Sequence, residues 1–289
     1  MTDDAFAAHR SLLFTVAYEM LGSASDAEDV VQETWLRWDG VDQTDVRDPR
    51  AYLVRIVTRQ ALNRLRTLSR RREDYVGEWL PEPLLTSPDV AADVELAENV
   101  SMAMLTVLET LGPAERAVFV LREVFDMPYD EIAEALDKSS SAIRQIAHRA
   151  RDHVAARRPR MDVSTTEQRA VVERFLAAVQ GGDVQGLLDV LAPDVVVVAD
   201  GGGIAAAALR PIVGARAVAR FLARAAGTAD FDVKVAWFNG WPGVRIEMGG
   251  HVDTAVSLCV EDGRVTRIFA VRNPNKLAHL NSVSPLARS

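Results

Sequence analysis

The spacing of apolar residues changes once along the chain, near residue 160, and this change limits the folds that the chain can adopt. Up to residue 155, apolar side chains recur at the three- and four-residue intervals of amphipathic helices. After a basic tether, Thr166 to Leu191 is also helical in pattern, but five runs of strand length follow, separated by glycine-rich breaks. These runs are VVVVA (195–199), VKVAWF (233–238), VRIEM (244–248), AVSLCV (255–260) and VTRIFAV (265–271). We therefore expect all-α domains followed by an α+β domain with antiparallel strands.

The length of 289 residues suits two or three domains with separate cores. A single cysteine, Cys259, excludes an intramolecular disulfide, and its place in a strand-like run favours a buried structural thiol. The N-terminus lacks an apolar signal core, and the longest apolar runs are strand-sized, so we expect a soluble, cytoplasmic protein. The five histidines are scattered, and neither a metal site nor a cofactor is predicted.

Charge is unevenly distributed in this chain of net charge -8. Residues 49–75 hold eight basic and two acidic side chains, whereas residues 76–98 hold six acidic side chains and no basic one. An acidic total weakens non-specific attraction to nucleic acid, but a compact basic block is a local electrostatic footprint for it. The acidic block contains Pro81, Pro83 and Pro88 and is typical of an extended linker.

The helix predicted after Pro49 carries the basic block on one face. At 100° per residue, Arg55, Arg59, Arg66 and Arg70 fall within about 60° of one another, with Asn63 beside them. A solvated helix usually interleaves glutamate with arginine, but no acidic residue lies between Pro49 and Arg72. Phosphate contact is therefore favoured over a merely solvated face.

A second nucleic-acid surface is predicted from two short helices. Residues Tyr129 to Leu136 and Ser140 to Arg151 are joined by a three-residue turn, in which Asp137 tolerates the left-handed conformation and Ser139 caps the second helix. Ile143, Ile146 and Ala150 then face inward. This is helix-turn-helix geometry, and a helical hairpin with a solvated serine-rich cap is the alternative. The residues expected on the outer, DNA-facing side are Ser139, Ser140, Ser141, Arg144, Gln145, His148 and Arg149.

An acidic helix precedes both surfaces, in the stretch DAEDVVQETWLR from Asp26 to Arg37. An acidic face beside exposed apolar residues, here Val30, Val31, Trp35 and Leu36, suits a protein partner with a basic groove, although an ordinary amphipathic helix has the same pattern. The residues expected to contact that partner are Asp26, Glu28, Asp29, Gln32, Glu33 and Leu36.

Together these segments resemble a sigma factor of the sigma-70 family, in its compact extracytoplasmic function (ECF) group, over all of residues 1–155. DAEDVVQETWLR resembles the helix that grips the polymerase clamp. RAYLVRIVTRQALNRLR resembles the -10 promoter helix, with Asn63 where Asp is common and Arg66 at the usual arginine. LGPAERAVFVLREVFDMPYDEIAEALDKSSSAIRQIAHRAR resembles the domain that reads the -35 element.

The C-terminal part resembles a SnoaL-like domain of the NTF2-like cone fold, here called the cone domain. Sigma factors with this extension share a linker motif, read here as WLPEP (Trp79 to Pro83), a DGGG stretch that begins at Asp200, and a terminal NPxKL motif. The resemblance implies regulatory contacts by Trp79, Pro81, Pro83, Asp200, Asn273, Pro274, Lys276 and Leu277.

The expected fold class is thus a multidomain chain with two all-α sigma domains, a helical bundle and a helix-turn-helix, followed by an α+β SnoaL-like domain. The predicted boundaries are region 2 at 1–72, linker at 73–98, region 4 at 99–157, tether at 158–165, SnoaL-like domain at 166–280 and tail at 281–289.

The resemblance implies a promoter-specificity subunit whose partners are core RNA polymerase and promoter DNA, with the cone domain acting in cis. Arg144 and Gln145 would read the -35 element, Arg55, Arg59 and Arg66 would hold the -10 backbone, and the loop 40–49 would capture an unstacked base.

Two other functions stay open at this point. Asp200, His251 and Asp253 offer acid-base groups for a SnoaL-like enzyme, and a ligand-responsive helix-turn-helix repressor would also contain DNA-reading helices. A small ligand in the cone domain is a further candidate partner, for the sigma factor as for these alternatives.

Overall fold

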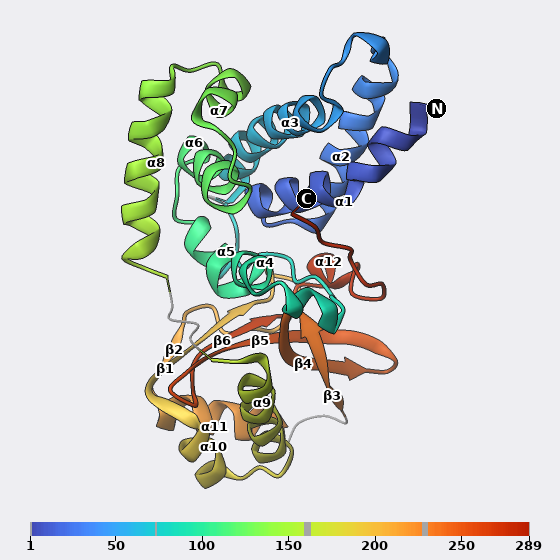
Figure 1. Ribbon diagram of the computed structural model, residues 1–289. Coiled ribbons are helices and arrows are strands. Elements are labelled where there is room, and N and C mark those ends of the chain that lie inside the picture. Colours follow the sequence, from blue (N-terminus) through green and yellow to red (C-terminus); the bar gives the residue numbers. More distant parts are fainter. Residues whose placement is uncertain (1, 73, 159–162, 227–230, 289) are drawn as a thin grey trace. The chain divides into compact units, whose positions relative to one another are not determined.

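The computed structural model of the protein describes residues 2–72, 74–158, 163–226 and 231–288, with every side chain in them except those of residues 2–4 and 69–72. The chain forms two compact units (Figure 1). The first contains residues 1–73, 104–158 and 285–289, and the second contains residues 74–103 and 159–284. The predicted linker therefore belongs to the same unit as the cone domain. No helix in the described ranges is long and apolar enough to cross a membrane.

The N-terminal part of the first unit is a bundle of three helices, α1 (Thr2–Leu21), α2 (Ala24–Asp39) and α3 (Pro49–Arg72), with the 3₁₀ turn η1 (Gln43–Asp45) before α3. Its core contains Leu13, Tyr18 and Trp38, all buried. Val30 and Val31 are also buried, so the prediction that they are exposed on α2 was wrong. They pack inward because α2 is covered along one side by both α1 and α3.

The rest of the first unit contains the end of α5 (Met102–Leu108), then α6 (Pro113–Phe119), a π-helical turn η3 (Val120–Val124), α7 (Tyr129–Leu136) and α8 (Ser140–Ala155). The predicted turn between α7 and α8 is confirmed, since Asp137 has φ 53° and ends α7 in the left-handed region. Ser139 caps α8 by accepting a hydrogen bond from the Ala142 amide, and α8 runs one turn beyond the predicted Arg151.

The second unit is built on a six-stranded sheet in the order β2-β1-β6-β5-β4-β3. The strands are β1 (Leu191–Asp200), β2 (Ile212–Val213), β3 (Asp232–Phe238), β4 (Trp241–Met248), β5 (His251–Glu261) and β6 (Arg264–Val271). The expected antiparallel pairing is found in four of the five pairings among the described strands, but β1 pairs parallel with β6, with Asp200 opposite Val271. The chain between β1 and β6 returns to the same end of the sheet, so the two strands run in the same direction.

Side chains alternate between the two faces of this sheet and define two separate cores. Helices α9 (Thr165–Gln180), α10 (Val184–Val190) and α11 (Ala215–Ala226) cover one face, where Val197 and Ile268 are buried (Figure 1). We call this the helix face. The opposite, linker face carries α12 (Pro274–Leu277), the start of α5 and linker residue Leu80. The linker itself forms η2 (Pro88–Ala92) and α4 (Val94–Val100) after an extended stretch.

The cysteine lies on the linker face, in a core of Leu80, Phe269 and Leu277. Burial raises the pKa of the Cys259 thiol to about 12, which keeps it protonated and unreactive at neutral pH. The prediction of a buried structural thiol is confirmed.

Candidate DNA-binding surfaces and linker site

The outer face of α8 presents the residues that the helix-turn-helix pattern predicts. Arg144, Gln145, His148 and Arg149 are exposed, while Ile143, Ile146 and Ala150 are buried. The serines at the start of α8 are engaged locally, since Ser140 donates a hydrogen bond to Asp130 and the Ser139 and Ser141 hydroxyls are 3.1 Å apart. The helix therefore keeps a polar, cationic outer face and an apolar inner one.

The side chains on this face make only peripheral contacts. The Arg144 guanidinium lies 5.6 Å from the centroid of the Tyr129 ring, and Arg149 Nε lies 3.7 Å from the Glu115 carboxylate. The His148 ring is 3.0 Å from Asp152, one turn along the same helix. Exposed pairs of this kind contribute about 0–1 kcal/mol, so DNA phosphates or base edges can replace them at little cost.

The arginine stripe of α3 contacts the end of α7 within the first unit. Arg55 forms an ion pair with the Glu134 carboxylate. Arg59 donates from Nε to the Ala135 carbonyl (2.9 Å) and from Nη2 to the Glu134 carbonyl (2.8 Å). The last carbonyls of a helix lack partners inside it and lie at the negative end of its dipole. The end of α7 thus offers these arginines the same kind of acceptors as a phosphate group.

Further along the stripe, Asn63 and Arg66 are exposed, and Arg66 Nη1 lies 3.4 Å from the Asn63 side-chain oxygen. The side chain of Arg70 and the tether residues 159–162 lie outside the described residues. The predicted -10 surface thus has an outer part, Asn63 and Arg66, that is exposed, and an inner part, Arg55 and Arg59, that bonds to the end of α7 while Arg59 stays exposed.

A cavity of about 440 Å³ adjoins the inner part of the stripe at Arg55. It lies between the loop predicted to capture a base and the α7 segment, with Val46 and Asp48 on one wall and Met127, Glu131 and Glu134 on the other. Arg55 contributes to its lining, beside the ring of Tyr52 at 5.2 Å.

The acidic residues of α2 are paired within their own bundle. Arg64 on α3 lies 3.1 Å from Asp26, 3.4 Å from Asp29 and 3.2 Å from Glu33, while Arg10 pairs with Glu28 at 2.6 Å. The predicted polymerase face is therefore less acidic than the sequence suggests. Gln32 and Leu36 remain exposed, Leu36 to 59%.

Asp200 is the centre of a buried polar cluster that joins the linker to the cone domain. Its carboxylate is fully buried and accepts four hydrogen bonds. The donors are Tyr75 Oη (2.6 Å), the Leu80 amide (2.9 Å), the Gly202 amide (3.0 Å) and Lys276 Nζ (2.7 Å). Two of the four donors come from the linker. We call the set Tyr75, Trp79, Leu80, Asp200, Asn273 and Lys276 the linker site.

The Lys276 ammonium is held from several sides in this site. Besides Asp200, it donates to the Leu80 carbonyl (2.5 Å), and it lies 3.2 Å from the centroid of the Trp79 ring. Tyr75 meets Trp79 edge to face at 4.8 Å. Burial and the hydrogen bond to Asp200 raise the pKa of Tyr75, so its hydroxyl acts as a donor at neutral pH. Aromatic rings and a carboxylate together replace the water that a buried ammonium loses.

Two glycines of the DGGG stretch are required because neighbouring atoms lie too close to them to admit a side chain. A Cβ on Gly201 would lie 2.1 Å from the Ala205 carbonyl oxygen, and one on Gly202, whose φ is 60°, would lie 2.2 Å from the Asn273 amide nitrogen. That nitrogen donates to Tyr75 Oη at 2.8 Å. Glycine at 202 therefore lets Asn273 reach the linker tyrosine.

The linker is also bound further along, at the β3–β4 turn. The Leu84 amide donates to the Asn239 side chain (3.0 Å), the Thr86 amide donates to the Trp237 carbonyl (2.9 Å), and Leu85 forms a β-bridge with Phe238. Pro81 and Pro83, between these contacts, are buried. Residues 75–86 thus run as an ordered strand-like segment along the linker face.

The structure brings Trp79, Asp200, Asn273 and Lys276 together, with Pro274 at the first position of α12 and Leu277 in the adjoining apolar core. Sequence reasoning missed Tyr75, Leu80 and Asn239. Leu80 lies inside the WLPEP motif but acts through its backbone amide, which its side-chain type does not indicate, and Asn239 acts from the β3–β4 turn. Tyr75 is an aromatic residue at the end of the basic block, and its spacing of four from Trp79 was the available signal.

Another buried polar group lies between α1 and α6 in the first unit. Glu19 is fully buried, and neither of its carboxylate oxygens has a hydrogen-bond partner among the described residues. Arg116 donates from Nε to the Glu19 carbonyl (2.9 Å) and from Nη1 to Glu109 (2.6 Å). Burial raises the pKa of Glu19 to about 8 against the opposing effect of Arg116 and Arg288, so this carboxyl is mainly protonated at neutral pH.

Comparison with known families matches three parts of the chain. The model of sigma-70 region 2 matches residues 5–71, that of sigma-70 region 4 matches residues 101–154, and that of the SnoaL-like domain matches residues 172–268.

Similar proteins cover almost the whole chain. The ECF RNA polymerase sigma factor SigJ of Mycobacterium tuberculosis is 39% identical over 287 residues, which cover 94% of this chain and 91% of SigJ. The probable ECF RNA polymerase sigma factor SigI of the same organism is 33% identical over 281 residues, with 96% and 95% covered. The crystal structure of M. tuberculosis SigJ superposes with a TM-score of 0.76 at 35% identity, covering 95% of this chain and 98% of that one.

Proposed function

Since this chain belongs to the extracytoplasmic function (ECF) sigma factors, we propose that it binds core RNA polymerase, directs it to specific promoters and is regulated in cis by its cone domain. Initiation by such a factor needs a polymerase contact and two DNA contacts. The exposed part of α2, the outer face of α8 and the arginine stripe of α3 supply surfaces of the required chemistry.

In this proposal the two DNA surfaces have different tasks. Arg144 and Gln145 project from the first two turns of α8, where a recognition helix meets base edges in the major groove. Arg55, Arg59 and Arg66 hold phosphates of the -10 region, which adds affinity without sequence preference. The contact of Arg55 and Arg59 with the end of α7 supports a resting state in which -10 DNA must displace α7.

The observation that carries the regulatory part is the fourfold hydrogen bonding of Asp200. It fixes residues 75–86 to the cone domain, although these residues connect the two DNA-reading regions in sequence. An extended chain of that length spans roughly 40 Å. Because residues 75–86 are fixed, the linker cannot extend fully between the two DNA-reading regions. The linker site therefore restrains promoter binding, and release of the linker from the cone domain relieves that restraint.

The cone domain serves as a regulator rather than an enzyme in this proposal. Of the acid-base groups that an enzyme would use, Asp200 is saturated by the linker site, and Asp253 is held by Arg272 through both carboxylate oxygens (2.9 and 3.0 Å). His251 is exposed at the start of β5. The residues that the enzyme hypothesis requires are thus engaged separately, and the similar full-length proteins are named as sigma factors.

In vitro transcription with core polymerase and a selected promoter library tests the proposal. The intact chain should direct transcription from a subset of promoters, and Asp200→Asn should raise the yield from them. Asp194→Asn is the matched control, since Asp194 lies on the same strand but is exposed. Equal yields from the two variants and the unaltered chain would exclude regulation through the linker site. A lower yield from Asp200→Asn would reverse the sign of the restraint.

A further inference from the structure

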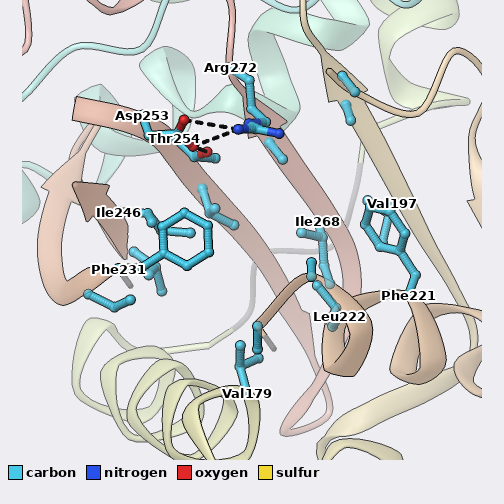
Figure 2. Close-up of a pocket in the computed structure, with 18 of the residues that line it drawn as sticks. Val179, Val197, Phe221, Leu222, Phe231, Ile246, Asp253, Thr254, Ile268 and Arg272 are labelled. Atoms are coloured by element: carbon cyan, nitrogen blue, oxygen red, sulfur yellow. Dashed lines mark hydrogen bonds and ion pairs between the residues drawn. The ribbon is translucent and has the colours of Figure 1, made fainter. Parts of the chain in front are cut away.

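The cone domain contains a cavity of about 770 Å³ on the helix face of the sheet (Figure 2). Its walls come from α9, α11 and five strands, so it lies inside the second unit. Most of the lining is aliphatic or aromatic, with Val179, Phe221, Leu222, Phe231 and Ile246 among the larger side chains. Pockets that bind a drug-sized organic molecule commonly have this size and a mainly apolar lining.

Two charged side chains lie in the lining, and they neutralise each other. Arg272 Nη2 is 2.9 and 3.0 Å from the two carboxylate oxygens of Asp253, and the Thr254 hydroxyl donates to the same carboxylate at 2.6 Å. Burial opposes ionisation of Asp253, but the hydrogen bonds from Arg272 and Thr254 outweigh it and lower its pKa. At neutral pH the described lining therefore carries no net charge.

Arg272 nevertheless keeps hydrogen-bonding capacity toward the cavity. A guanidinium has five N–H groups, and here Nη1 donates to the Ala206 carbonyl (2.6 Å) while Nη2 donates to Asp253. Nη2 contacts both Asp253 oxygens, but Nη1 carries a second hydrogen besides the one bonded to Ala206, and the side chain is 31% exposed. Figure 2 shows Arg272, Asp253 and Thr254 together at one end of the set, with labelled apolar side chains such as Val179 and Leu222 away from them. A bound molecule thus meets a donor at one end and hydrocarbon elsewhere.

We propose that this cavity binds a neutral, mainly apolar small molecule that carries a carbonyl or hydroxyl oxygen at the Arg272 end. Binding of this molecule changes how strongly the linker site binds residues 75–86. An anion or cation would have to enter a charge-balanced apolar cavity without a counter-charge, which is unfavourable. The binding part stands alone, whereas the transmission to the linker rests on the proposed function.

The route of transmission is short and made of hydrogen bonds. The amides of Arg272 and Asn273 both donate to the Asp200 carbonyl, at 2.7 and 3.0 Å. Side chains alternate here, so Arg272 faces the cavity while Asn273 reaches Tyr75 in the linker site. On β1, likewise, Ala199 lines the cavity and Asp200 holds the linker. A shift of Arg272 toward a ligand therefore moves groups that hold the linker.

Nile red is a suitable probe, because it is neutral, largely apolar and carries one carbonyl. We expect one molecule to bind per intact chain with blue-shifted emission, and the anionic dye 1-anilinonaphthalene-8-sulfonate to bind at least tenfold more weakly. Ala270→Phe, which fills the cavity from β6, should weaken Nile red binding at least tenfold. Val213→Phe adds the same ring at an exposed position on β2 and should leave binding unchanged. Leu222→Trp fills the cavity from α11 if Ala270→Phe does not fold.

The role of the Arg272–Asp253 pair in binding is tested by replacing both charged side chains. Arg272→Met combined with Asp253→Leu leaves no unpaired buried charge and should weaken Nile red binding at least threefold. Undiminished binding in the filled variants would overturn the cavity as the site. Undiminished binding in the double variant, or equal binding of the sulfonate dye, would overturn the proposed ligand class.

Hydrogen exchange of residues 75–85 tests transmission without polymerase or DNA. Saturating Nile red should change exchange of these amides at least threefold in the intact chain and in Val213→Phe, but not in Ala270→Phe. Binding without any such change would overturn the coupling and leave the transcription experiment on Asp200 as an independent test of the proposed function.

Discussion

The linker site makes a quantitative prediction about the Asp200–Lys276 pair. Both side chains are buried, Asp200 completely and Lys276 to 3% exposure. Removing one partner of a buried pair leaves an uncompensated charge and typically costs 3–5 kcal/mol. In Asp200→Asn the ammonium loses its counter-charge, and the amide presents N–H groups where the site supplies donors. We expect local opening of the linker to become about 3–5 kcal/mol easier.

Hydrogen exchange at the Leu80 amide measures this opening in the intact chain, since that amide donates to Asp200 Oδ2. Each 1.4 kcal/mol is a factor of ten in an equilibrium constant, so Asp200→Asn should speed exchange more than 100-fold. Lys276→Met should also speed it strongly, because it leaves the carboxylate without its ammonium. Asp194→Asn should not change it.

The double variant Asp200→Asn with Lys276→Met decides whether the effect comes from the pair. Neighbouring groups couple by about 0.5–3 kcal/mol, and removing both charges leaves no unpaired one. The free energy of linker opening should therefore fall clearly less in the double variant than the sum of its falls in the two single variants. The reasoning is refuted if Asp200→Asn accelerates Leu80 exchange less than tenfold. It is also refuted if the two single effects add fully.

Three further predictions concern the first unit. Glu134→Ala should free Arg55 and strengthen binding of a non-specific DNA duplex up to about fivefold at low salt, measured by fluorescence anisotropy; an exposed pair contributes only about 0–1 kcal/mol, and a weaker binder would contradict the α7 displacement. Glu19 keeps its proton in the fold up to about pH 8, so the stability of α1 should fall between about pH 5 and 8, by at most about 1.4 kcal/mol per pH unit. In Glu19→Gln, the stability of α1 should no longer fall with pH, as measured by hydrogen exchange of the α1 amides in urea. Arg144→Ala should cost about 1–3 kcal/mol on a matching -35 element and little on a scrambled one, and equal losses on both would remove α8 from base reading.

Local features of the fold were predictable because nearby residues determine them. Asp137 tolerates the left-handed turn and Ser139 offers an N-cap, so the α7–α8 boundary followed from side-chain chemistry alone. The strand runs followed from their apolar and β-branched residues in the same way. Alternation along β1 separates Val197 from Val198 and Asp200, but the sequence does not say which face the linker covers.

The pairing of charges was not predictable, because it depends on elements distant in sequence. Most of the predicted acidic face of α2 forms ion pairs with Arg64, about 35 residues later. The arginine stripe of α3 was read as free for phosphate, whereas Arg55 and Arg59 contact α7 some 75 to 79 residues further along. Glu19 gave no signal, since a glutamate in an amphipathic helix is normally solvated. Periodicity places a side chain on a face, but only tertiary packing selects its partner.

The parallel pairing of β1 with β6, which the sequence did not predict, is what makes the linker site possible. Because the two strands run in the same direction, Asp200 and Val271 end at the same edge of the sheet. The chain after β6 enters α12 at Pro274, and there Asn273 and Lys276 reach Tyr75 and Asp200. In an antiparallel pair the end of β1 would lie beside the start of β6, and the NPxKL motif would emerge at the opposite edge. The DGGG and NPxKL motifs therefore act as one site only in the observed topology, and the same edge places Arg272 at the end of the cavity.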